Sequence, residues 1–512
     1  MILTGPPKVT LRAARPRAYD GAIAAARTCY SPRVIEDSEI TEKQRDSIGP
    51  LTFTAGHHTV FQHATFEFGL ENVSRQFVWA FLHSHPFYNS EQSSQRFVKL
   101  GEARAYVPEG LPEEARAVYE GSIEKGWEAY ARLSQILVKD TEEIIGDIRH
   151  LSSTASEARR KKVSREAEKK AIEVARYVIP IGAFTSMVHS LSGIVLHRLY
   201  RMSRSSDTPS EASAVIGEMV RLARAHDPAF FERVGETPFE GDQIVESRWP
   251  RSAAAAAATA AEIDARLGAR VSLLVDHTGN AENITADAMR AVLGVDRSAL
   301  SDDEAIERAL SPGLNQYRLD AMDLSPYSPI SRVSHHASYT FLKKLSHTAD
   351  SQDQRHRMTP ASRPMLTLTH TTAPDVVVPP LIAANPAARA VFEDAVAAAW
   401  QAKERLLALG LSDELAVYVL PNAVALRFHE SGSLMYLAHK WVMRTCLNAQ
   451  EEIYRASMDE LEQVRAVHPR LAKHMGPPCV LRRGRITPTC TEGEHFCGIP
   501  VWRDFPNVVR RL

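Results

Sequence analysis

Two short stretches far apart in this chain follow the same pattern. His63–Phe68 reads His-Ala-Thr-Phe-Glu-Phe, and His336–Phe341, 273 positions further on, reads His-Ala-Ser-Tyr-Thr-Phe. After the alanine, each stretch alternates polar and aromatic residues, which is the period of a β-strand with one buried face. The repeated strand indicates that a larger structural unit occurs twice.

The rest of the chain contains further matches in the same order. At the same offset Leu82–Ser84 faces Arg355–Arg357, and at an offset of 241 Glu173–Pro180 faces Glu414–Pro421. Only loop lengths differ between the copies, and a period of about 270 residues is too long for a solenoid, so we expect two fused domains that form a pseudo-dimer. Chance similarity between amphipathic segments is the alternative interpretation.

Composition narrows the class of protein. The 512 residues include 61 basic and 62 acidic side chains, which argues against a nucleic-acid-binding protein that depends on overall positive charge. No apolar stretch is long enough to span a membrane, and Met1–Lys8 lacks the features of a secretory signal. Five cysteines in so long a chain do not form a disulfide scaffold. We therefore expect a cytoplasmic protein.

Gln352–Arg363 contains a dense group of cations, Arg355, His356 and Arg357, just after a glutamine. Guanidinium groups bind planar or phosphorylated anions through two parallel hydrogen bonds, so this triplet predicts an anion site. A solvated basic edge is the alternative. Another polar run, Asn89–Arg96, ends in a single cation and is typical of a surface loop.

These motifs resemble those of the flavin-dependent thymidylate synthase family, divided between the two halves of the chain. That family has an Arg-His-Arg triplet, a polar loop that ends in Ser-x-Arg-aromatic, and a Gly-His-Glu-Thr-Pro-Phe-Glu-His-like segment. The first half keeps Gly56–His63, Ser94–Phe97 and Ala175–Arg176. The second half keeps Gln352, Arg355–Arg357, Leu420–Pro421, Arg427, Ser433–Met435, Arg444 and Ala449–Glu452.

The losses in the two halves are complementary. The first half has Leu82–Ser84 in place of the triplet, whereas the second half has shortened the loop to Ala361–Arg363 and has Val417 opposite Arg176. Each active site of the family lies between subunits, so a fused pair needs only one complete set of residues. The resemblance therefore implies one composite site, in which Ser94, Arg96 and Arg176 face Gln352, Arg355 and Arg444.

The resemblance also implies a reaction. The family uses FAD, reduced by NADPH, to transfer a one-carbon unit from methylenetetrahydrofolate to C5 of dUMP, so no nucleophilic cysteine is required. Arg96, Arg176 and Arg444 are suited to bind a nucleotide phosphate, and Arg355 is suited to polarise a pyrimidine carbonyl. The implied roles are catalysis by Arg355, Ser94 and Gln352, substrate binding by Glu91, Gln92, Ser93, Arg96, Arg176 and Arg444, and flavin binding by His57, Thr59, His356 and Arg357.

Several positions depart from the family pattern. Its Asn-x-Arg pair reads Glu430–Gly432 in the second half and His189–Leu191 in the first, and the histidine before Ala-Gln is Asn448. The loop also has one extra residue, so Ser93 and Ser94 compete for one role. Besides methylation of dUMP, two alternatives therefore stay open: an enzyme for another pyrimidine nucleotide, and a catalytically silent nucleotide-binding or scaffold protein.

A separate signal lies near the C-terminus, where three of the five cysteines fall within 19 residues. Thiolates with a histidine form tetrahedral zinc sites, and the predicted ligands are Cys479, Cys490, Cys497 and His495. No Cys-x-x-Cys pair is present, and free thiols in a loop-rich tail are the alternative.

The sequence thus predicts an α+β protein with two domains like those of flavin-dependent thymidylate synthases, each a small sheet with packed helices. We expect them at residues 1–250 and 265–512, with a cysteine-rich extension from about residue 474. The alanine run that Ser252 precedes predicts a connecting helix. The expected partners are a nucleotide and a folate, with no nucleic acid and no membrane, and we expect two chains to associate as a homodimer of pseudo-dimers.

Overall fold

The computed structural model describes residues 2–96, 98–205 and 207–512. Within them lie two four-stranded antiparallel sheets, one in each half of the chain. The strands of the first sheet are β1 (Lys8–Ala14), β2 (Thr65–Ser74), β3 (Tyr88–Gln92) and β4 (Phe184–Ser192). Those of the second sheet are β5 (Ser272–His277), β6 (Ser338–Ser346), β7 (Ala361–Ser362) and β8 (Ala425–Ser433).

The two sheets have the same topology. Their strand orders are β1-β2-β4-β3 and β5-β6-β8-β7, so each strand of one sheet has a counterpart in the other. The long central strands β2 and β4 alternate buried and more exposed side chains, which is why one face of each packs against helices. The predicted α+β fold and the tandem repeat are confirmed. The boundaries at residues 250 and 265 stay a prediction.

Helices cover the sheets and join the halves. In the first half they are α1 (Ala18–Thr28), α2 (Glu42–Thr54), α3 (Arg75–His83), α4 (Glu113–Ile148), α5 (Glu157–Ala175), α6 (Gly193–Met202), α7 (Pro209–His226) and α8 (Ala229–Glu232). The connecting helix α9 (Ala253–Leu267) begins after Ser252, whose hydroxyl accepts a hydrogen bond from the Ala255 amide, as a helix cap does.

The second half contains a comparable set of helices. They are α10 (Ala281–Leu293), α11 (Asp302–Leu310), α12 (Pro329–Arg332), α13 (His347–Asp353), α14 (Leu366–Thr369), α15 (Pro380–Ala384), α16 (Pro386–Ala408), α17 (Asp413–Val417), α18 (Leu434–Arg444), α19 (Glu451–Val467), α20 (Pro469–Ala472), α21 (Pro478–Arg482) and α22 (Val501–Asp504). No helix in the described part of the chain combines the length and the apolar content that crossing a membrane requires.

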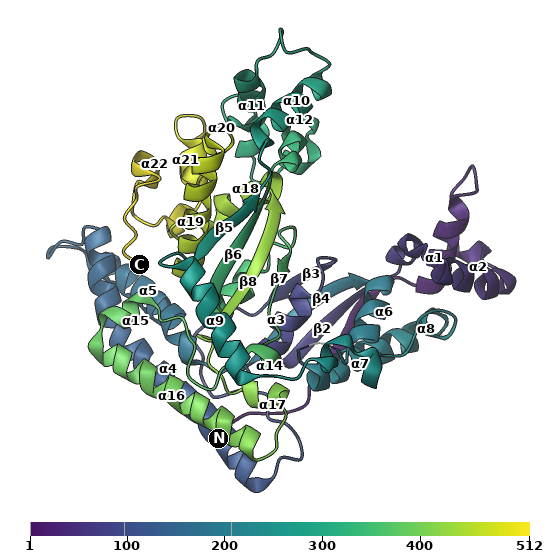
Figure 1. Ribbon diagram of the computed structural model, residues 1–512, viewed down its shortest axis with the longest axis horizontal. Helices are drawn as coiled ribbons and strands as arrows, with labels where there is room; N and C mark the ends of the chain where they lie inside the picture. The colour runs from purple at the N-terminus through teal and green to yellow at the C-terminus, as the bar shows by residue number, and fades with distance from the viewer. Residues whose placement is uncertain (1, 97, 206) are drawn as a thin grey trace.

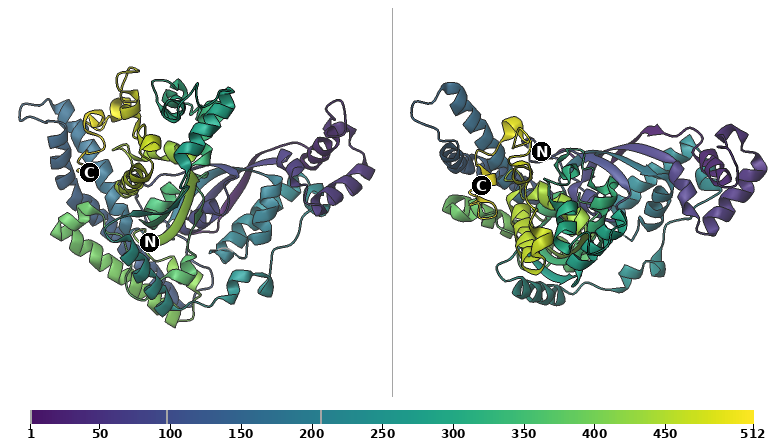
Figure 2. Two further views of the ribbon diagram at one scale, coloured as in Figure 1. Left: turned by 45° about the horizontal axis from the view of Figure 1, so that its top comes forward. Right: turned by 90° about the horizontal axis from the view of Figure 1, so that it is seen from above.

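The sheets lie next to each other at the centre of the molecule (Figure 1). Along one side, α4 of the first half packs against α16 of the second. Helices α1 and α2 form the opposite end, as the views in Figure 2 also show. One hydrophobic core contains side chains from both halves, including Trp79 and Tyr119 from the first and Trp400 and Val419 from the second. The two copies therefore share a core.

Paired backbone hydrogen bonds at the junction reveal a pseudo-twofold axis. The Ile181 amide donates to the Leu420 carbonyl and the Asn422 amide donates to the Ile179 carbonyl, each at 2.8 Å. The donors are 241 positions apart, as are the acceptors, so the two bonds are equivalent in the two copies. Such reciprocal contacts define an isologous interface, which here occurs within one chain.

The structure corrects one predicted alignment. Strand β2 has one more residue than its partner β4 between the Leu70 and Val73 pairs, whereas β6 pairs with β8 without a shift. The bulge reduces the offset between the halves from 273 to 272, and the capping serines of α3 and α13 are Ser74 and Ser346. The triplet Arg355–Arg357 therefore lies opposite residues 83–85 and not Leu82–Ser84.

A second expectation was wrong as well. The run from Asn89 was predicted to be a surface loop, but Tyr88–Gln92 forms the edge strand β3, which pairs with β4. Pairing at a sheet edge uses backbone groups, so a polar sequence does not prevent it. The motif segment Gly56–His63 ends in a 3-10 helix, η2 (His58–His63).

Candidate functional site

The two halves meet where β3 of the first faces the cationic triplet of the second. Arg355, which lies just after α13, donates from Nη2 to the Ser90 carbonyl at 2.9 Å and pairs with the Glu91 carboxylate at 3.1 Å. The Arg355 side chain is 37% exposed and that of Glu91 is 89% exposed, so this pair is open to solvent. Its guanidinium keeps donors available to a ligand, because exposed pairs of this kind hold each other weakly.

Arg96 and Arg444 approach the same place from opposite halves. Arg96 pairs with Glu173 at 2.5 Å. It also donates at 2.9 Å to the carbonyl of Asn448, a residue that lies four positions after Arg444 in the sequence. Burial lowers the pKa of Arg444, and the positive charges of Arg96 and Arg355 add to that effect. The charge of Arg444 is therefore affected both by Arg96 of the first half and by Arg355 of its own half.

His356, the middle residue of the triplet, faces the protein and holds Arg444 in position. Its Nε2 accepts a hydrogen bond from Arg444 Nε at 2.9 Å. Burial lowers the pKa of His356 well below the usual range, and the charge of Arg444 adds to this, so the imidazole is neutral at pH 7. An acceptor at Nε2 requires the proton to be on Nδ1. The predicted flavin contact of His356 is not evident in this geometry.

Arg176 and Arg75 form a second, deeper cationic pair. Arg176 Nη2 donates to Gln450 Oε1 at 2.8 Å, but Arg176 Nε is buried without a hydrogen-bond partner among the described residues. Arg75 is 6% exposed and its Nε and Nη1 have none there either. Burial lowers the pKa of Arg176 to about 10, and burial together with Arg176 lowers that of Arg75 to about 9. Buried donors of this kind are expected to have an anionic partner.

Sequence reasoning missed Arg75. It lies at the start of α3, among apolar residues that predict a helix core, and no family motif includes it. A cation at a position that the helical pattern assigns to the interior was the available signal.

The two competing serines have different surroundings. The Ser93 hydroxyl hydrogen-bonds to the Ser186 hydroxyl on β4 at 2.8 Å, so it anchors the loop to the sheet. The Ser94 hydroxyl accepts from the Arg96 amide at 3.2 Å, which keeps it beside the arginine. Gln92 donates to Thr185 at 3.3 Å. Ser94 is therefore the better candidate for a ligand contact, and Phe97, which follows in the motif, lies outside the described residues.

Gln352 is the last predicted catalytic residue of the second half. Its carbonyl accepts from Arg444 Nη2 at 3.3 Å, while its side-chain Oε1 is buried and has no partner among the described residues. Within the described residues, this side-chain oxygen is thus available to accept a hydrogen bond.

Arg357 lines a wide cleft on the first-half sheet. The cleft has a volume of ≈ 720 Å³ and joins the residues around Arg357 to a neighbouring space of ≈ 350 Å³ that Arg355 also lines. The Arg357 guanidinium stands 4.9 Å from the Tyr88 ring, and the Tyr88 hydroxyl is buried without a partner among the described residues. Paired arginines beside an aromatic ring and an unpaired hydroxyl fit a flavin with its diphosphate.

Two predicted flavin residues are not part of this cleft. His57 and Thr59 lie at the start of η2, are exposed, and are not among the described lining residues of either space. The cleft is reached instead by Gln62 of the same 3-10 helix, together with Arg198 from α6.

The missing Asn-x-Arg pair also has a structural explanation. Glu430, which stands in the place of its asparagine, is buried and bonds Lys343 at 2.8 Å and Lys440 at 2.7 Å. Asp353, three residues before His356, pairs with both lysines. Burial opposes ionisation of Asp353 and Glu430, but the two lysines outweigh it and lower both pKa values. The carboxylate of Glu430 is thus committed to the core beneath the triplet.

The predicted zinc ligands do not form a ready site. In the part of the chain that the structure describes, no group of three or more His, Cys, Asp or Glu side chains is arranged to hold a metal ion. His495 contributes its backbone carbonyl to Asn448 and lines a cleft beside Arg96. Its predicted role as a metal ligand is therefore not supported by its position.

Comparison with known proteins agrees with this geometry. Residues 10–229 and 273–470 both match the family described as thymidylate synthase complementing protein. The chain belongs to this family. Each matched segment covers one of the two sheets except for the first one or two residues of β1 or β5, so the predicted resemblance and its tandem arrangement are confirmed.

Individual relatives match between about a third and a half of the chain. A flavin-dependent thymidylate synthase of Clostridium tetani is 26% identical over 239 residues, which is 46% of this chain and 89% of that protein. One from Geobacter sulfurreducens is 30% identical over 229 residues, 44% of this chain and 92% of that protein. One from Saccharolobus solfataricus is 31% identical over 180 residues, or 34% of this chain and 66% of that protein.

Proposed function

We propose that this chain is a flavin-dependent thymidylate synthase-like enzyme that methylates dUMP to dTMP with methylenetetrahydrofolate and NADPH. The observation that carries the proposal is the meeting of Arg96 with Arg355 and Arg444 at one junction between the halves. The names of its relatives support the same activity. The site would be composite, with one set of residues drawn from each half.

In this proposal the cations divide the work of binding. Arg96, Arg176 and Arg444 would hold the nucleotide phosphate, since charge-assisted hydrogen bonds to phosphate oxygens are strong and need buried, pre-positioned donors. Arg75 would add a fourth donor group near Arg176, since its Nε and Nη1 have no partner among the described residues. Glu173, whose pKa is far below the usual range because Lys170 and Arg96 outweigh its burial, would keep Arg96 oriented.

The residues beside the pyrimidine would polarise it. Arg355 would donate to a ring carbonyl and withdraw electron density as charge develops there. Gln352 Oε1, which has no partner among the described residues, and the Ser94 hydroxyl would fix the ring. FAD, when bound, would supply the redox chemistry that completes the methyl group. Arg357 and Tyr88 would hold it in the cleft on the first-half sheet.

A second candidate is a silent nucleotide-binding protein. One observation favours it, namely that Glu430 occupies the family's asparagine position and is committed to two lysines. Such a chain would keep the phosphate site while lacking part of the flavin site. Action on another pyrimidine nucleotide is the third alternative, and the same assay addresses it.

The test uses the purified full chain. Its absorption spectrum should show bound flavin, or flavin should bind on reconstitution, and dTMP should form from dUMP with methylenetetrahydrofolate and NADPH. Arg355→Ala should lower kcat about 10²–10³-fold while the circular dichroism spectrum stays unchanged. Colourless protein that binds dUMP but cannot be loaded with FAD would establish the silent alternative, and turnover of dCMP in place of dUMP would establish the third.

A further inference from the structure

Four of the five cysteines surround one small internal space. They are Cys446, Cys479, Cys490 and Cys497, and the space has a volume of ≈ 20 Å³. A cavity of that size holds about one small sphere such as a water molecule. Its other walls are mostly apolar, which makes it unsuitable for water with several polar partners.

The four side chains come from separate parts of the chain. Cys446 follows the end of α18, whereas Cys479 lies in α21 and the other two belong to the loops before and after η9 (Gly493–His495). A stretch of more than thirty residues separates Cys446 from the rest of the group. This long gap is why the sequence pattern did not reveal Cys446 as a fourth member.

The ionisation of these thiols also reflects their closeness. Burial raises the pKa of Cys446 to about 11 and that of Cys479 to about 12, and the charges of the other cysteines add to both shifts. The pKa of Cys497 is raised by burial and by Cys490. The four side chains line one space, and sulfur ligands are those that soft or borderline cations prefer.

We propose that Cys446, Cys479, Cys490 and Cys497 bind one Zn²⁺ ion as a four-thiolate structural site. Zinc takes four sulfur ligands in tetrahedral geometry at about 2.3 Å, and a site closed by protein on all sides is structural and not catalytic. Binding forms four Zn–S bonds and releases the four thiol protons to solvent, with no change of oxidation state. The described sulfurs do not yet form a ready site, so the loops would close around the ion.

The proposed site has a different ligand set from the one predicted by sequence. Cys446 replaces His495, whose ring is not among the described lining of the cavity. A four-sulfur set selects soft or borderline cations such as zinc over magnesium or calcium, which prefer oxygen ligands.

The ion would connect the C-terminal extension to the loop between α18 and α19. This loop follows Arg444 and contacts Arg96, which are both predicted substrate residues. Cys446 and Asn448 lie on this loop, and the Asn448 side chain donates to Glu492 Oε2 at 3.0 Å and to the His495 carbonyl at 2.8 Å. The Asn448 carbonyl accepts from Arg96. The metal would therefore fix a loop that starts beside Arg444, although the site itself does not depend on the proposed function.

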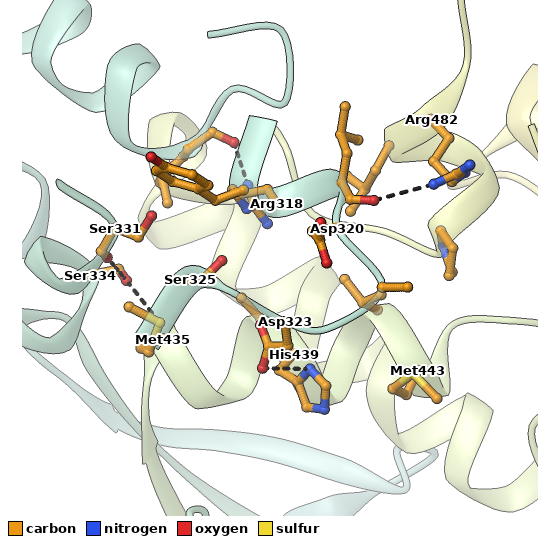
Figure 3. A pocket seen from close by; sticks show the side chains of 18 of the residues that line it. Arg318, Asp320, Asp323, Ser325, Ser331, Ser334, Met435, His439, Met443 and Arg482 are labelled. Carbon is orange, nitrogen blue, oxygen red and sulfur yellow. Dashed lines mark hydrogen bonds and ion pairs between the residues drawn. The ribbon is translucent and has the colours of Figure 1, made fainter. Parts of the chain in front are cut away.

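The same extension forms one wall of a separate cavity of ≈ 250 Å³ (Figure 3). Arg482 of α21 lines this cavity and donates to the Leu319 carbonyl at 3.2 Å, while on the opposite side His439 of α18 pairs with Asp323 at 3.2 Å. Glu492 lines both this cavity and the cysteine space. Ordering of the extension by a metal would thus extend to this second cavity.

The experiment measures the metal content of the full chain purified under reducing conditions. We expect one zinc per chain in the wild type and in two control variants, Cys29→Ser, whose cysteine is exposed and outside the group, and His495→Gln. Cys446→Ser should lose the zinc. Zinc retained in Cys446→Ser, or lost in His495→Gln, would overturn the proposed ligand set.

A second measurement does not require a variant that folds. Wild-type protein stripped with a chelator should bind one Co²⁺ per chain with thiolate-to-cobalt charge-transfer absorption and the visible bands of a tetrahedral ion, and Zn²⁺ should displace it. Each binding event should release protons and protect four thiols from alkylation. Absence of these bands, or disulfides between these cysteines in the reduced protein, would refute the site.

Discussion

The two pseudo-equivalent junctions of this molecule share a backbone plan but not their chemistry. At one junction Arg176 lies beside Tyr177, whose hydroxyl donates to Glu452 at 2.6 Å. At the other, Val417 lies beside Tyr418, whose hydroxyl donates to Glu211 at 2.7 Å. The tyrosines and glutamates correspond at an offset of 241. The two junctions therefore share this tyrosine–glutamate hydrogen bond but differ in having arginine or valine beside it.

We call these regions the arginine junction, which contains Arg96, Arg176, Arg355 and Arg444, and the closed junction, which contains Trp79, Asp350, Arg363 and Val417. In the closed junction Arg363 is 4% exposed and forms two hydrogen bonds to Asp350, at 2.7 and 2.9 Å. Trp79 donates to the same carboxylate at 2.7 Å. Its single guanidinium is therefore neutralised inside the protein.

Under the proposed function, the contrast would explain how a fused pair can lose one of its two sites. Once the halves are covalently joined, only one junction has to keep cations available for an anion. The other has Val417, which is fully buried, and an internal ion pair between Arg363 and Asp350. Among the described residues, Arg176 and Arg75 keep buried donors without a hydrogen-bond partner, and this supports the proposal that the arginine junction binds the anion.

The largest expected effect is the loss of the ion pair in the closed junction. Arg363→Met leaves Asp350 as a buried carboxylate without its cation, which should lower the free energy of unfolding by about 3–5 kcal/mol. The matched change in the other junction, Arg355→Met, removes an exposed pair and should cost about 0–1 kcal/mol. Urea unfolding measures both. Equal losses of unfolding free energy in the two variants would contradict the contrast between a buried ion pair in the closed junction and an exposed one in the arginine junction.

Next in size is a pH effect at the glutamate of the closed junction. Burial raises the pKa of Glu211 from 4.5 to about 7, against hydrogen bonds from Ser74 and Tyr418. Between these pH values the folded protein keeps a proton that the unfolded chain releases. The free energy of unfolding should therefore fall by on the order of 3 kcal/mol as pH rises from about 4.5 to about 7, and this contribution should not change further above that pH. Glu211→Gln should remove this part of the pH dependence, and an identical slope in the variant would contradict it.

A smaller effect concerns dUMP binding, which should depend on the arginine junction and not on the closed junction. Arg444→Ala should weaken binding of dUMP by about 1.5–3 kcal/mol, or roughly 10–100-fold, because it removes charge-assisted hydrogen bonds. Ser203→Ala is the matched control, since Ser203 holds the corresponding place in the closed junction and bonds only the Tyr200 carbonyl in the described structure. Calorimetry gives both dissociation constants. Similar weakening in both variants would place the nucleotide elsewhere.

The smallest expected effect distinguishes the two loop serines. Ser94→Ala should weaken dUMP binding by about 1 kcal/mol, roughly fivefold, as loss of one neutral hydrogen bond does. Ser93→Ala removes a contact to Ser186 on β4 and should leave the dissociation constant within about twofold. A larger effect of Ser93→Ala would show that the extra loop residue shifts the ligand contact to that serine.

Much of the fold was predictable because its signals are local or repeated. Alternation at His63–Phe68 and His336–Phe341 predicts one strand in each half, and the order of the matches predicts tandem domains. Edge strand β3 was missed because its pairing uses backbone groups that leave no side-chain pattern. The alignment error of one residue came from the bulge in β2, where Asn72 adopts a φ of 54°.

Only those residues of the candidate site that belong to a family motif could be predicted from the sequence. The sequence motifs identified Arg96, Arg176, Arg355 and Arg444, and the structure brings them together, while their roles stay predictions. His57 and Thr59 matched a motif, yet lie outside the cleft that Arg357 lines. A motif fixes residue type, but small changes in the path of the chain decide which cavity a side chain reaches.

The sequence alone determined that the chain is duplicated and that each half keeps a different subset of the family motifs. These facts are written in the order and identity of residues, so no coordinates were needed to find them. Only the tertiary structure decided that Arg75 is buried beside Arg176 and that Cys446 joins three cysteines of the distant C-terminal extension. Both depend on contacts between segments far apart in the chain, and such contacts are set by packing of the whole molecule and leave no periodic signal in the sequence.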